Sequence, residues 1–451
     1  MKVIKFGGSS LADAKQILKV CKIILSDDER RLVVVSAPGK RYSEDKKVTD
    51  MLISLAEASH NGENTDSILN EIVERYASIS SNLGLGKDII NLIKEDLTQR
   101  INTKTESYGK FVDLLKAAGE DNNAKLIACY LKSKGVNAEY VNPKDAGLIL
   151  TEEFGNAQVL PSSYEKLSEL AKRDTIMIFP GFFGYSEKGE VVTFSRGGSD
   201  VTGGILAAAI KASVYENFTD VDFVYAANPN LINNPFPIPL FTYEEMQELS
   251  YAGFSVLHEE ALAPVYKVGI PVNIRNTNNP DAKGTMIVPG NMAPKPTLPV
   301  VGIACDKGFL TLHVHKYMMN REIGFGRRLL QILEENNVPF EHMPSGMDSI
   351  SVIMREKHCT NGILEKMVEE IKSNLVVDSV VVEKNQAILM LVGRGMTKSV
   401  GVATRATAAF SKSGINIKMI NQGSSEVSIM FGVEEQDAKA AVVALYNEFF
   451  E

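Results

Sequence analysis

The chain begins Met1-Lys-Val-Ile-Lys-Phe-Gly-Gly-Ser-Ser10, a stretch that predicts a strand running directly into a glycine turn. Val3, Ile4 and Phe6 are strand formers, and the glycines that follow them predict a short buried strand. Glycine lets the backbone approach an anion, and the helix expected next would offer unpaired N–H groups. With Lys5 just before the turn, the stretch indicates a phosphate cradle. The alternative is an ordinary strand–turn–helix with an exposed lysine, because the P-loop pattern is absent.

Length and composition place the chain among ordinary globular proteins. Its 451 residues predict about two to four domains. A net charge of −8 gives no support for binding to nucleic acid or to a membrane surface. The four cysteines are scattered without metal-ligand spacing, so we expect reduced thiols, a cytoplasmic protein and no protein-held metal site. No apolar run reaches about 18 residues, and the first predicted strand leaves no room for a signal peptide.

Residues 1–290 alternate between predicted strands and helices. Strands alternating with helices predict an open, mostly parallel sheet that is covered on both faces, with ligands at the carboxyl ends of its strands. A helical insertion with many charges interrupts this pattern at about 52–118, and a proline-rich linker follows at 291–299. The predicted strands after the first are 31–36, 138–141, 175–179, 213–217 and 270–275.

The last third of the chain contains an internal repeat. Gly324 and Gly401 each open a predicted helix, 77 residues apart, and three further pairs keep the same spacing. Each copy has a βαββαβ pattern, the first at 307–384 and the second at 385–451. The expected strands include 309–315 and 339–343 in the first copy and 415–420 in the second. The second copy lacks its last strand, and an unpaired sheet edge is a liability. We therefore expect a spare strand at 300–306 to complete it, which nests the first copy inside the second.

A second glycine-rich turn lies at Ser195-Arg-Gly-Gly-Ser-Asp200, again between a predicted strand and a helix. Arg196 can hold a carboxylate with two parallel hydrogen bonds. The two glycines and Ser199 offer N–H groups suited to an anion. Asp200 is placed to orient Lys5 or to bind a metal–phosphate. The alternative is a capped helix start without a catalytic role.

Further candidate residues follow other predicted strands or begin helices. Thr219 and Asp220 end a strand, and Tyr225 can stack on a base or fill a gap in the core. Glu120 is a candidate for holding a substrate ammonium group, although a glutamate at a helix start is often only a partner of the helix dipole.

These motifs together resemble the aspartate kinase family over nearly the whole length of the chain. The resemblance implies an amino-acid-kinase fold followed by two ACT domains, which agrees with the nested repeat. The motifs that carry it, in the order of the family, are Lys5–Ser10, Gly119-Glu120, Phe154–Ala157, Gly181–Gly184, Ser195–Asp200, Thr219–Val221, Val256–His258, Ile415–Ile417 and Ser425-Glu426.

By this resemblance, the chain is expected to transfer a phosphoryl group from ATP, with Mg2+, to the β-carboxylate of L-aspartate. Phosphoryl transfer depends on positioning and cations more than on covalent chemistry, which suits Lys5 and Asp200 as the catalytic pair. The resemblance implies that the transferred phosphate is bound by Gly7, Gly8 and Ser9. It implies an aspartate pocket formed by Ser36, Thr49, Glu120, Phe182, Arg196 and Ser199, and a nucleotide site formed by Thr219, Asp220 and Tyr225.

The sequence departs from the family pattern at two cations that commonly meet ATP phosphates. Asn230 and Ser255 stand where arginine and lysine are usual, and Lys267 and Arg275 are candidates to compensate. These departures leave open a catalytically weak or inactive amino-acid sensor of the same fold as the alternative, although the intact Lys5, Arg196 and Asp200 favour an enzyme. A kinase for another acid, such as acetylglutamate, is disfavoured by the ACT repeat.

The resemblance also predicts feedback inhibition in the pathway to lysine, threonine and methionine. Lysine is the first expected effector, with threonine as alternative or co-effector. No homoserine dehydrogenase follows before Glu451, so a monofunctional enzyme is expected. The open sheets of ACT units need partners, which predicts a homodimer or a dimer of dimers. The expected effector residues are Gly324, Phe325, Glu341, Ser345 and Asp348.

Overall fold

The computed structural model describes residues 1–195, 197–254 and 259–451. The described chain divides into two compact units. The first contains Met1–Val224, Ile238–Tyr243 and residues 259–293, and the second contains Tyr225–Pro237, Glu244–Phe254 and Pro294–Glu451. Two segments that precede the proline-rich linker in sequence therefore belong to the second unit.

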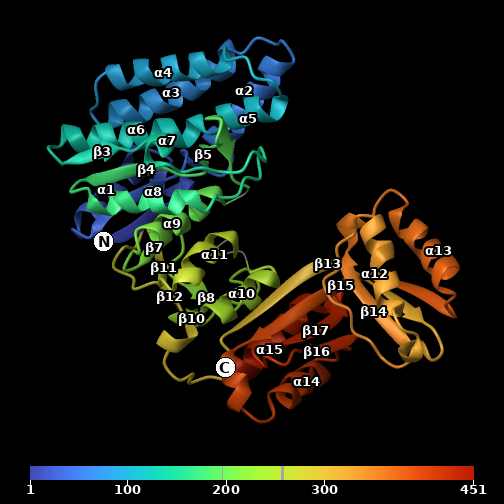
Figure 1. Ribbon diagram of the computed structural model, residues 1–451. Helices are drawn as coiled ribbons and strands as arrows, with labels where there is room; N and C mark the ends of the chain where they lie inside the picture. The colour runs from blue at the N-terminus through green and yellow to red at the C-terminus, as the bar shows by residue number, and fades with distance from the viewer. Residues whose placement is uncertain (196, 255–258) are drawn as a thin grey trace. The chain divides into compact units, whose positions relative to one another are not determined.

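The first unit is built on an eight-stranded sheet in the order β10-β12-β11-β7-β1-β2-β4-β3 (Figure 1). Every neighbouring pair is parallel except β11 and β12. This confirms the predicted open, mostly parallel sheet. The strands are β1 (Lys2–Phe6), β2 (Arg30–Val35), β3 (Ala138–Tyr140), β4 (Ile176–Pro180), β7 (Tyr215–Thr219), β10 (Leu240–Thr242), β11 (Val272–Asn276) and β12 (Thr285–Val288).

The central strands are buried on both faces, as their nearly continuous apolar sequence predicts. Val3, Ile4 and Phe6 of β1 are fully buried, and the Phe6 ring lies 5.1 Å from that of Phe218 on the neighbouring strand β7. The rigid centre of this sheet fixes the positions of the loops that leave it.

The helix predicted after the first glycine turn begins later than expected. A short 3-10 turn occupies Gly8–Leu11, and α1 runs over Ala14–Leu25. Asp13 sets this boundary, because its side chain accepts a hydrogen bond of 2.8 Å from the backbone N–H of Gln16. The glycine turn is thus a separate structure between strand and helix.

The region predicted as a helical insertion is helical, and its members lie together at one end of the first unit (Figure 1). α3 packs against both α2 and α4, and the Tyr76 hydroxyl donates a buried hydrogen bond of 2.8 Å to the carbonyl of Gly119. The helices of this region are α2 (Val48–His60), α3 (Asp66–Asn82), α4 (Asp88–Ile101) and α5 (Tyr108–Lys116), and α6 (Ala118–Ser133) follows them.

The other elements of the first unit pack around the sheet or extend it. α9 (Gly198–Ala209) lies beside α11 (Glu259–Val268), close enough that a Cβ atom on Gly204 would stand 2.4 Å from the carbonyl oxygen of Ala261. The remaining elements of this region are α7 (Pro143–Ala146), α8 (Ser162–Ser168), β5 (Phe183–Tyr185) and β6 (Val191–Thr193).

The second unit contains a five-stranded antiparallel sheet in the order β14-β13-β15-β17-β16. The strands expected at 300–306 and 309–315 form one strand, β13 (Gly302–His315), in which Gly308 has φ +79° at a shift in register. Residues 302–307 pair with 387–392 of the second repeat, which confirms the nested arrangement. The other strands are β14 (Ser349–Arg355), β15 (Ser379–Val392), β16 (Met419–Gln422) and β17 (Ser428–Glu434).

Of the strands predicted in the repeat, one is absent and another is shorter than expected. The segment 339–343 forms no regular strand and pairs with β14 only through the isolated bridge His342–Ile353. Prolines at 339 and 344 explain this, because proline cannot donate a ladder hydrogen bond. The strand expected at 415–420 begins only at Met419, as part of β16.

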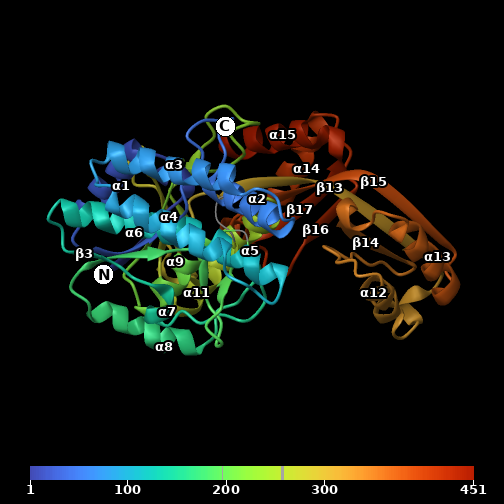
Figure 2. The same cartoon turned by 90° about the horizontal axis from the view of Figure 1, so that it is seen from above.

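Pairs of helices cover each half of this second sheet. Figure 2 shows α12 near α13 and α14 beside α15, and these pairs are in contact. The paired helices are α12 (Phe325–Glu335), α13 (Ile363–Leu375), α14 (Val402–Lys412) and α15 (Ala438–Phe450), and α10 (Tyr243–Tyr251) precedes them in the chain.

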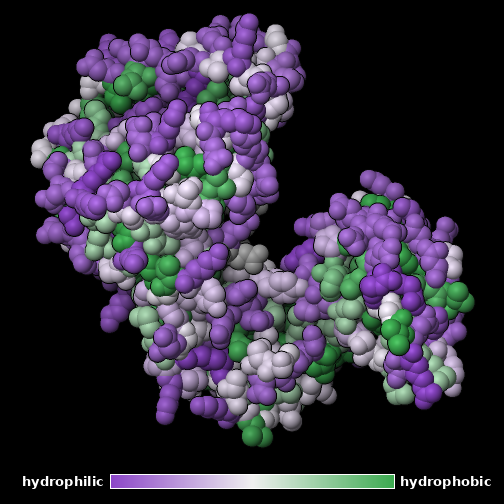
Figure 3. All heavy atoms as spheres, viewed as in Figure 1, coloured by the Kyte–Doolittle hydropathy of each residue, from purple (hydrophilic) through white to green (hydrophobic). Residues whose placement is uncertain are grey.

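Hydrophilic residues dominate the visible face of both units, interspersed with apolar side chains (Figure 3). No helix among the described residues is long and apolar enough to cross a membrane.

Candidate active site

Four neighbouring parallel strands end at one edge of the first sheet, and several predicted site residues follow them. β7, β1, β2 and β4 are adjacent in this order. Gly7 follows β1, Ser36 follows β2, Gly181 follows β4 and Thr219 ends β7. The topology therefore brings together residues that stand more than 200 positions apart in sequence, at the edge where α/β sheets bind ligands.

The first glycine turn is held by backbone contacts with two neighbouring loops. The N–H of Gly7 donates to the carbonyl of Phe218 at 3.3 Å, and the N–H of Gly39 donates to the carbonyl of Gly8 at 2.9 Å. A Cβ atom on Gly39 would lie 2.5 Å from the carbonyl carbon of Gly8, so only glycine fits there. The turn is thus fixed closely against the loop that follows β2, with Ser9 exposed beside it.

Lys5 and Asp200 form an ion pair at the centre of this edge. The distance from Lys5 Nζ to Asp200 Oδ1 is 2.6 Å, and Lys5 is only 8% exposed. The structure therefore brings together the two residues expected as the catalytic pair. A buried ammonium next to a glycine turn can stabilise negative charge on a phosphoryl group.

The loop after β4 packs tightly on the start of α9. A Cβ atom on Gly181 would stand 2.7 Å from the side chain of Ser199, so this predicted site residue lies against the loop that carries Phe182. Phe182 has a φ of +75°, which is rare for a bulky residue, and its N–H donates to the hydroxyl of Thr202 at 3.0 Å. Arg196, the predicted carboxylate clamp, lies outside the described residues.

Glu120 is a buried carboxyl group in the first turn of α6. It is 5% exposed, and its Oε2 atom has no hydrogen-bond partner. Burial raises the pKa of Glu120 to about 7, while a hydrogen bond from the backbone of Ala37 and the nearby ammonium of Lys116 act in the opposite direction. An unpartnered buried oxygen that titrates near neutral pH is suited to receive an ammonium group.

Lys116 is a cation of this region that the sequence analysis missed. Its ammonium lies 5.1 Å from the centre of the Phe182 ring and 3.3 Å from the hydroxyl of Thr193. Its only sequence signal is its place four residues before Glu120, across the boundary between α5 and α6. Side-chain packing, rather than a motif, brings it to Phe182.

The remaining predicted residues are less closely joined. Thr49 lies in the first turn of α2. The Thr219 hydroxyl donates to the carboxylate of Asp220 at 3.1 Å, at the exposed end of β7. Tyr225 and Asn230 belong to the second unit. Ser255 lies outside the described residues.

Arg275 does not serve as a spare cation. Its guanidinium donates to Glu216 at 2.9 Å and to the carbonyl of Pro280 at 2.6 Å. Glu216 is buried and also accepts two hydrogen bonds from Arg30. The suggestion that Arg275 compensates for a missing phosphate-binding cation is therefore wrong, because this group neutralises a buried carboxylate. Lys267 remains exposed in the last turn of α11.

The residues expected to bind an effector lie in the first repeat of the second unit. Gly324 has φ +82° and caps α12, and the ring of Phe325 lies 5.5 Å from the ammonium of Lys316. The N–H of Met318 donates to the Asp348 side chain at 2.7 Å. The two remaining residues of the set, Glu341 and Ser345, lie in the irregular stretch that precedes β14 and forms isolated bridges with it.

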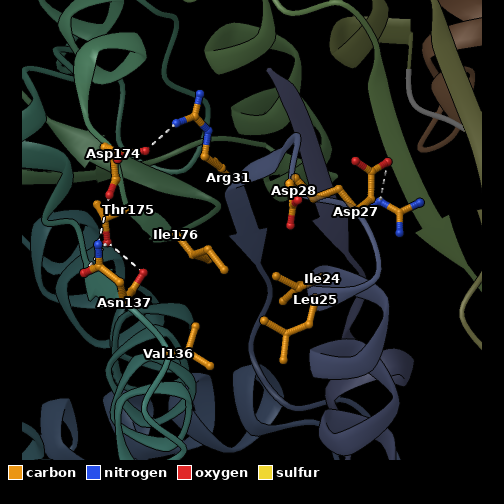
Figure 4. Close-up of a pocket in the computed structure, with 11 residues that line it drawn as sticks. Ile24, Leu25, Asp27, Asp28, Arg31, Val136, Asn137, Asp174, Thr175 and Ile176 are labelled. Atoms are coloured by element: carbon orange, nitrogen blue, oxygen red, sulfur yellow. Dashed lines mark hydrogen bonds and ion pairs between the residues drawn. The ribbon is translucent and has the colours of Figure 1, made fainter.

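A separate cavity of about 550 Å3 opens at the amino ends of β2 and β4. Figure 4 shows its lining, including the ion pair of 3.0 Å between Arg31 and Asp174. Because the candidate site lies at the carboxyl ends of the same strands, this cavity is distinct from it. Within the described ranges, no group of three His, Cys, Asp or Glu side chains is placed to hold a metal ion.

Comparison with known proteins gives matches over the whole chain. Residues 1–276 match the amino acid kinase family, and residues 389–449 match an ACT domain. Aspartokinase 3 of Bacillus subtilis is 54% identical over 450 residues, covering 100% of this chain and 99% of that protein.

Solved structures agree with this result. The crystal structure of Clostridium acetobutylicum aspartate kinase, described as an allosteric enzyme, is 40% identical with a TM-score of 0.88 and full coverage of both chains. Escherichia coli aspartokinase III is 26% identical, again with full coverage of both chains. Its TM-score is 0.79 for the R-state complex with aspartate and ADP, and 0.75 for the T-state complex with lysine and aspartate.

Proposed function

Because the chain belongs to the amino acid kinase family and, within it, to the aspartokinases, we propose how its own residues carry out and regulate this activity. The chain is an aspartate kinase, regulated allosterically by amino acids. The reaction transfers the γ-phosphoryl group of ATP to the β-carboxylate of L-aspartate and leaves ADP. The observation that carries the residue assignment is the 2.6 Å ion pair of Lys5 and Asp200 beside the Gly7–Gly8 turn.

In this proposal, Lys5 provides the positive charge for phosphoryl transfer. Negative charge spreads over the phosphoryl oxygens in the transition state, so a fixed cation stabilises it without moving. Asp200 holds the Lys5 ammonium in place. The acceptor is a carboxylate that is already ionised, so no general base is needed. Backbone N–H groups at the turn of Gly7, Gly8 and Ser9 bind the phosphoryl group as it moves.

Aspartate binds between the loops that follow β2 and β4. Glu120 pairs with its α-ammonium, which is supported by the unpartnered Oε2 atom. Arg196 pairs with the α-carboxylate, an assignment that rests on its sequence motif alone. The other members of the proposed pocket are Ser36, Thr49, Phe182 and Ser199.

ATP is proposed to enter as its magnesium complex. Mg2+ is commonly held by substrate phosphates with one or two carboxylates rather than by an all-protein cage. When bound, the ion neutralises phosphate charge. Thr219, Asp220 and Tyr225 are the residues proposed to face the nucleotide.

Regulation is proposed to act through the second unit, with lysine as the first effector to test and threonine as the alternative. A ligand that binds one of two states more tightly shifts the population toward that state, which inhibits without blocking the active site. The proposed effector residues are those of the first repeat, centred on Glu341.

The second unit also supports a homodimer or a dimer of dimers. One edge of its sheet is β16, where Ile420 is half-exposed, whereas the other end strand, β14, is bridged by residues 342 and 345. Ile323 and Met347 are largely exposed apolar side chains, with Ile323 97% exposed. Apolar surface and free sheet edges are commonly covered in an assembly. Light scattering of the wild type and Ile420→Asp would test whether β16 contributes.

A coupled assay of ADP release with a panel of amino-acid acceptors tests the proposed function. Aspartate should support turnover, and hydroxylamine should trap the acyl phosphate product. Release of ADP with acetylglutamate but not aspartate would overturn the substrate assignment. Binding of lysine without turnover on any acceptor would instead favour the amino-acid sensor, for which the replaced cation at Asn230 is the supporting observation.

A further inference from the structure

β7 carries a buried polar residue, Asn217, at a position where the fold needs none. Asn217 is 3% exposed and lies in the middle of a central strand. Burial of an amide costs free energy unless hydrogen bonds satisfy it, and an apolar β-branched residue would fill such a position readily. The amide therefore needs an explanation beyond packing.

The register of the sheet places Asn217 directly beside Lys5. β1 and β7 are parallel, and Lys5 is paired with Asn217. The side-chain Nδ2 of Asn217 donates a hydrogen bond of 2.7 Å to Asp200 Oδ1, the same oxygen that receives the Lys5 ammonium at 2.6 Å. One carboxylate oxygen is thus held between an ammonium from β1 and an amide from β7.

A second contact from the same strand holds the backbone of Asp200. The Tyr215 hydroxyl donates to the carbonyl oxygen of Asp200 at 3.1 Å. β7 therefore fixes both the main chain and the carboxylate of Asp200 from a rigid strand. This matters because lysine has a long flexible side chain, and its ammonium can be no better placed than the group that holds it.

We propose that Asn217 is a positioning residue of the kinase: its amide orients the Asp200 carboxylate, which in turn holds the Lys5 ammonium where phosphoryl charge develops. Asn217 touches neither substrate in this arrangement and acts only through Asp200. The inference rests on the proposed function, because it assigns Asn217 a part in the Lys5-assisted step. Glu216, its buried neighbour on β7, has a different role, since it pairs with Arg30 and Arg275.

A double-mutant cycle tests the proposal. Asn217→Leu should lower kcat roughly ten- to a hundredfold, the range of one hydrogen bond to a charged group, and leave both KM values within about twofold. In an Asp200→Ala background, the same change should cost less than about twofold, because the group through which Asn217 acts is absent. Asn273→Leu on the adjacent strand β11 is the matched control and should leave kcat unchanged.

The outcomes separate this inference from the proposed function. Failure of the wild type to phosphorylate aspartate would remove the function itself. A normal wild type with equal losses from Asn217→Leu in both backgrounds, or with no loss in either, would overturn only the positioning role. Asn217→Ala, checked by thermal unfolding, replaces the leucine variant if that does not fold. If neither variant folds, Asn217 serves the core and the inference is wrong.

Discussion

The phenolic hydroxyl of Tyr251 donates a hydrogen bond of 2.5 Å to the carboxylate of Glu341, 90 residues further along the chain. Both residues belong to the second unit. The Glu341 carboxylate also receives Arg355 at 3.0 Å, and the His342 ring meets the Tyr251 ring edge-on at 5.7 Å. The carboxylate proposed to receive an effector ammonium is therefore already bound on two sides.

This relationship predicts competition between Tyr251 and the effector. Tyr251→Phe removes the hydrogen bond and keeps the ring. The Glu341 carboxylate then loses one of its two partners and is more available to the ammonium group of an effector. We expect half-maximal lysine inhibition at a roughly tenfold lower concentration, from the size of a hydrogen bond to a charged group. Inhibition curves at fixed aspartate concentration measure this shift.

The control for this prediction is Glu341→Gln, which should weaken lysine inhibition while uninhibited turnover stays nearly unchanged. Ser345→Leu, in the next turn of the same segment, should also weaken inhibition. Unchanged lysine curves in all three variants would place the effector site away from this segment.

The buried carboxyl of Glu120 predicts a pH-dependent affinity for aspartate. With its pKa raised to about 7, Glu120 is protonated below that pH and cannot attract an ammonium group. KM for aspartate should therefore rise as the pH falls below about 7, and aspartate binding should release a proton. Steady-state kinetics from pH 6 to 8.5 and calorimetry in buffers of different ionisation enthalpy measure the two effects. A flat KM across this range would contradict the assignment.

The same group predicts a gain in stability for Glu120→Gln at high pH. The folded state retains the Glu120 proton up to about pH 7, whereas the ordinary value is 4.5. The folded state therefore binds more protons between these values, and the free energy of unfolding falls as the pH rises through them. Above pH 7 the free energy of unfolding is therefore about 3 kcal/mol lower than it is below pH 4.5, as far as this group is concerned. Glu120→Gln should recover part of it while losing aspartate affinity, as urea unfolding and kinetics would show.

Lys5 should be essential for turnover but not for folding. Lys5→Ala removes the cation proposed to face the phosphoryl group and should lower kcat by about 100- to 1,000-fold. Lys15→Ala, an exposed lysine on α1, is the matched control and should behave as the wild type. Turnover of Lys5→Ala within tenfold of the wild type would be incompatible with the phosphate-cradle assignment.

Arg75 should couple the helical region to the active-site loop. This guanidinium, on α3, donates to Asp45 at 2.8 Å and also to the carbonyl of Gly39, which touches the Gly8 turn. Hydrogen bonds from Arg41, together with a hydrogen bond and the positive charge of Arg75, hold the pKa of Asp45 well below its ordinary value. Removal of one partner from a buried pair commonly costs 3 to 5 kcal/mol, so Arg75→Met should lower the free energy of unfolding by about 3 kcal/mol.

Arg41→Met provides the comparison for Arg75. Both arginines bind Asp45, but the Arg41 side chain is 39% exposed whereas that of Arg75 is 4% exposed. Solvent screens an exposed pair, so Arg41→Met should cost less than about 1 kcal/mol. Urea unfolding separates the two variants. Equal losses of unfolding free energy would show that burial does not set the strength of the two ion pairs with Asp45. Arg75→Met should also lower kcat/KM several-fold at temperatures where it remains folded.

Much of the architecture is determined locally and could be read from the sequence. The apolar runs of β1, β2 and β4 define buried parallel strands, and the spacing of 77 residues between Gly324 and Gly401 defines the nested repeat. Lys5, the two glycines after it and Asp200 were identifiable because glycine turns at strand ends are local features. The segment 339–343 was predicted as a strand, but its flanking prolines remove donors and leave only isolated bridges.

What the sequence by itself determined, then, is the succession of strands, turns and helices, the repeat, and the glycine turns that mark the site. Only the tertiary structure decided which polar groups meet. The pairing of β1 with β7 brings Asn217 to Asp200, packing of α3 brings Arg75 to Gly39, and Arg275 is committed to Glu216. These contacts depend on register and burial between segments far apart in the chain, which periodicity and local motifs do not encode.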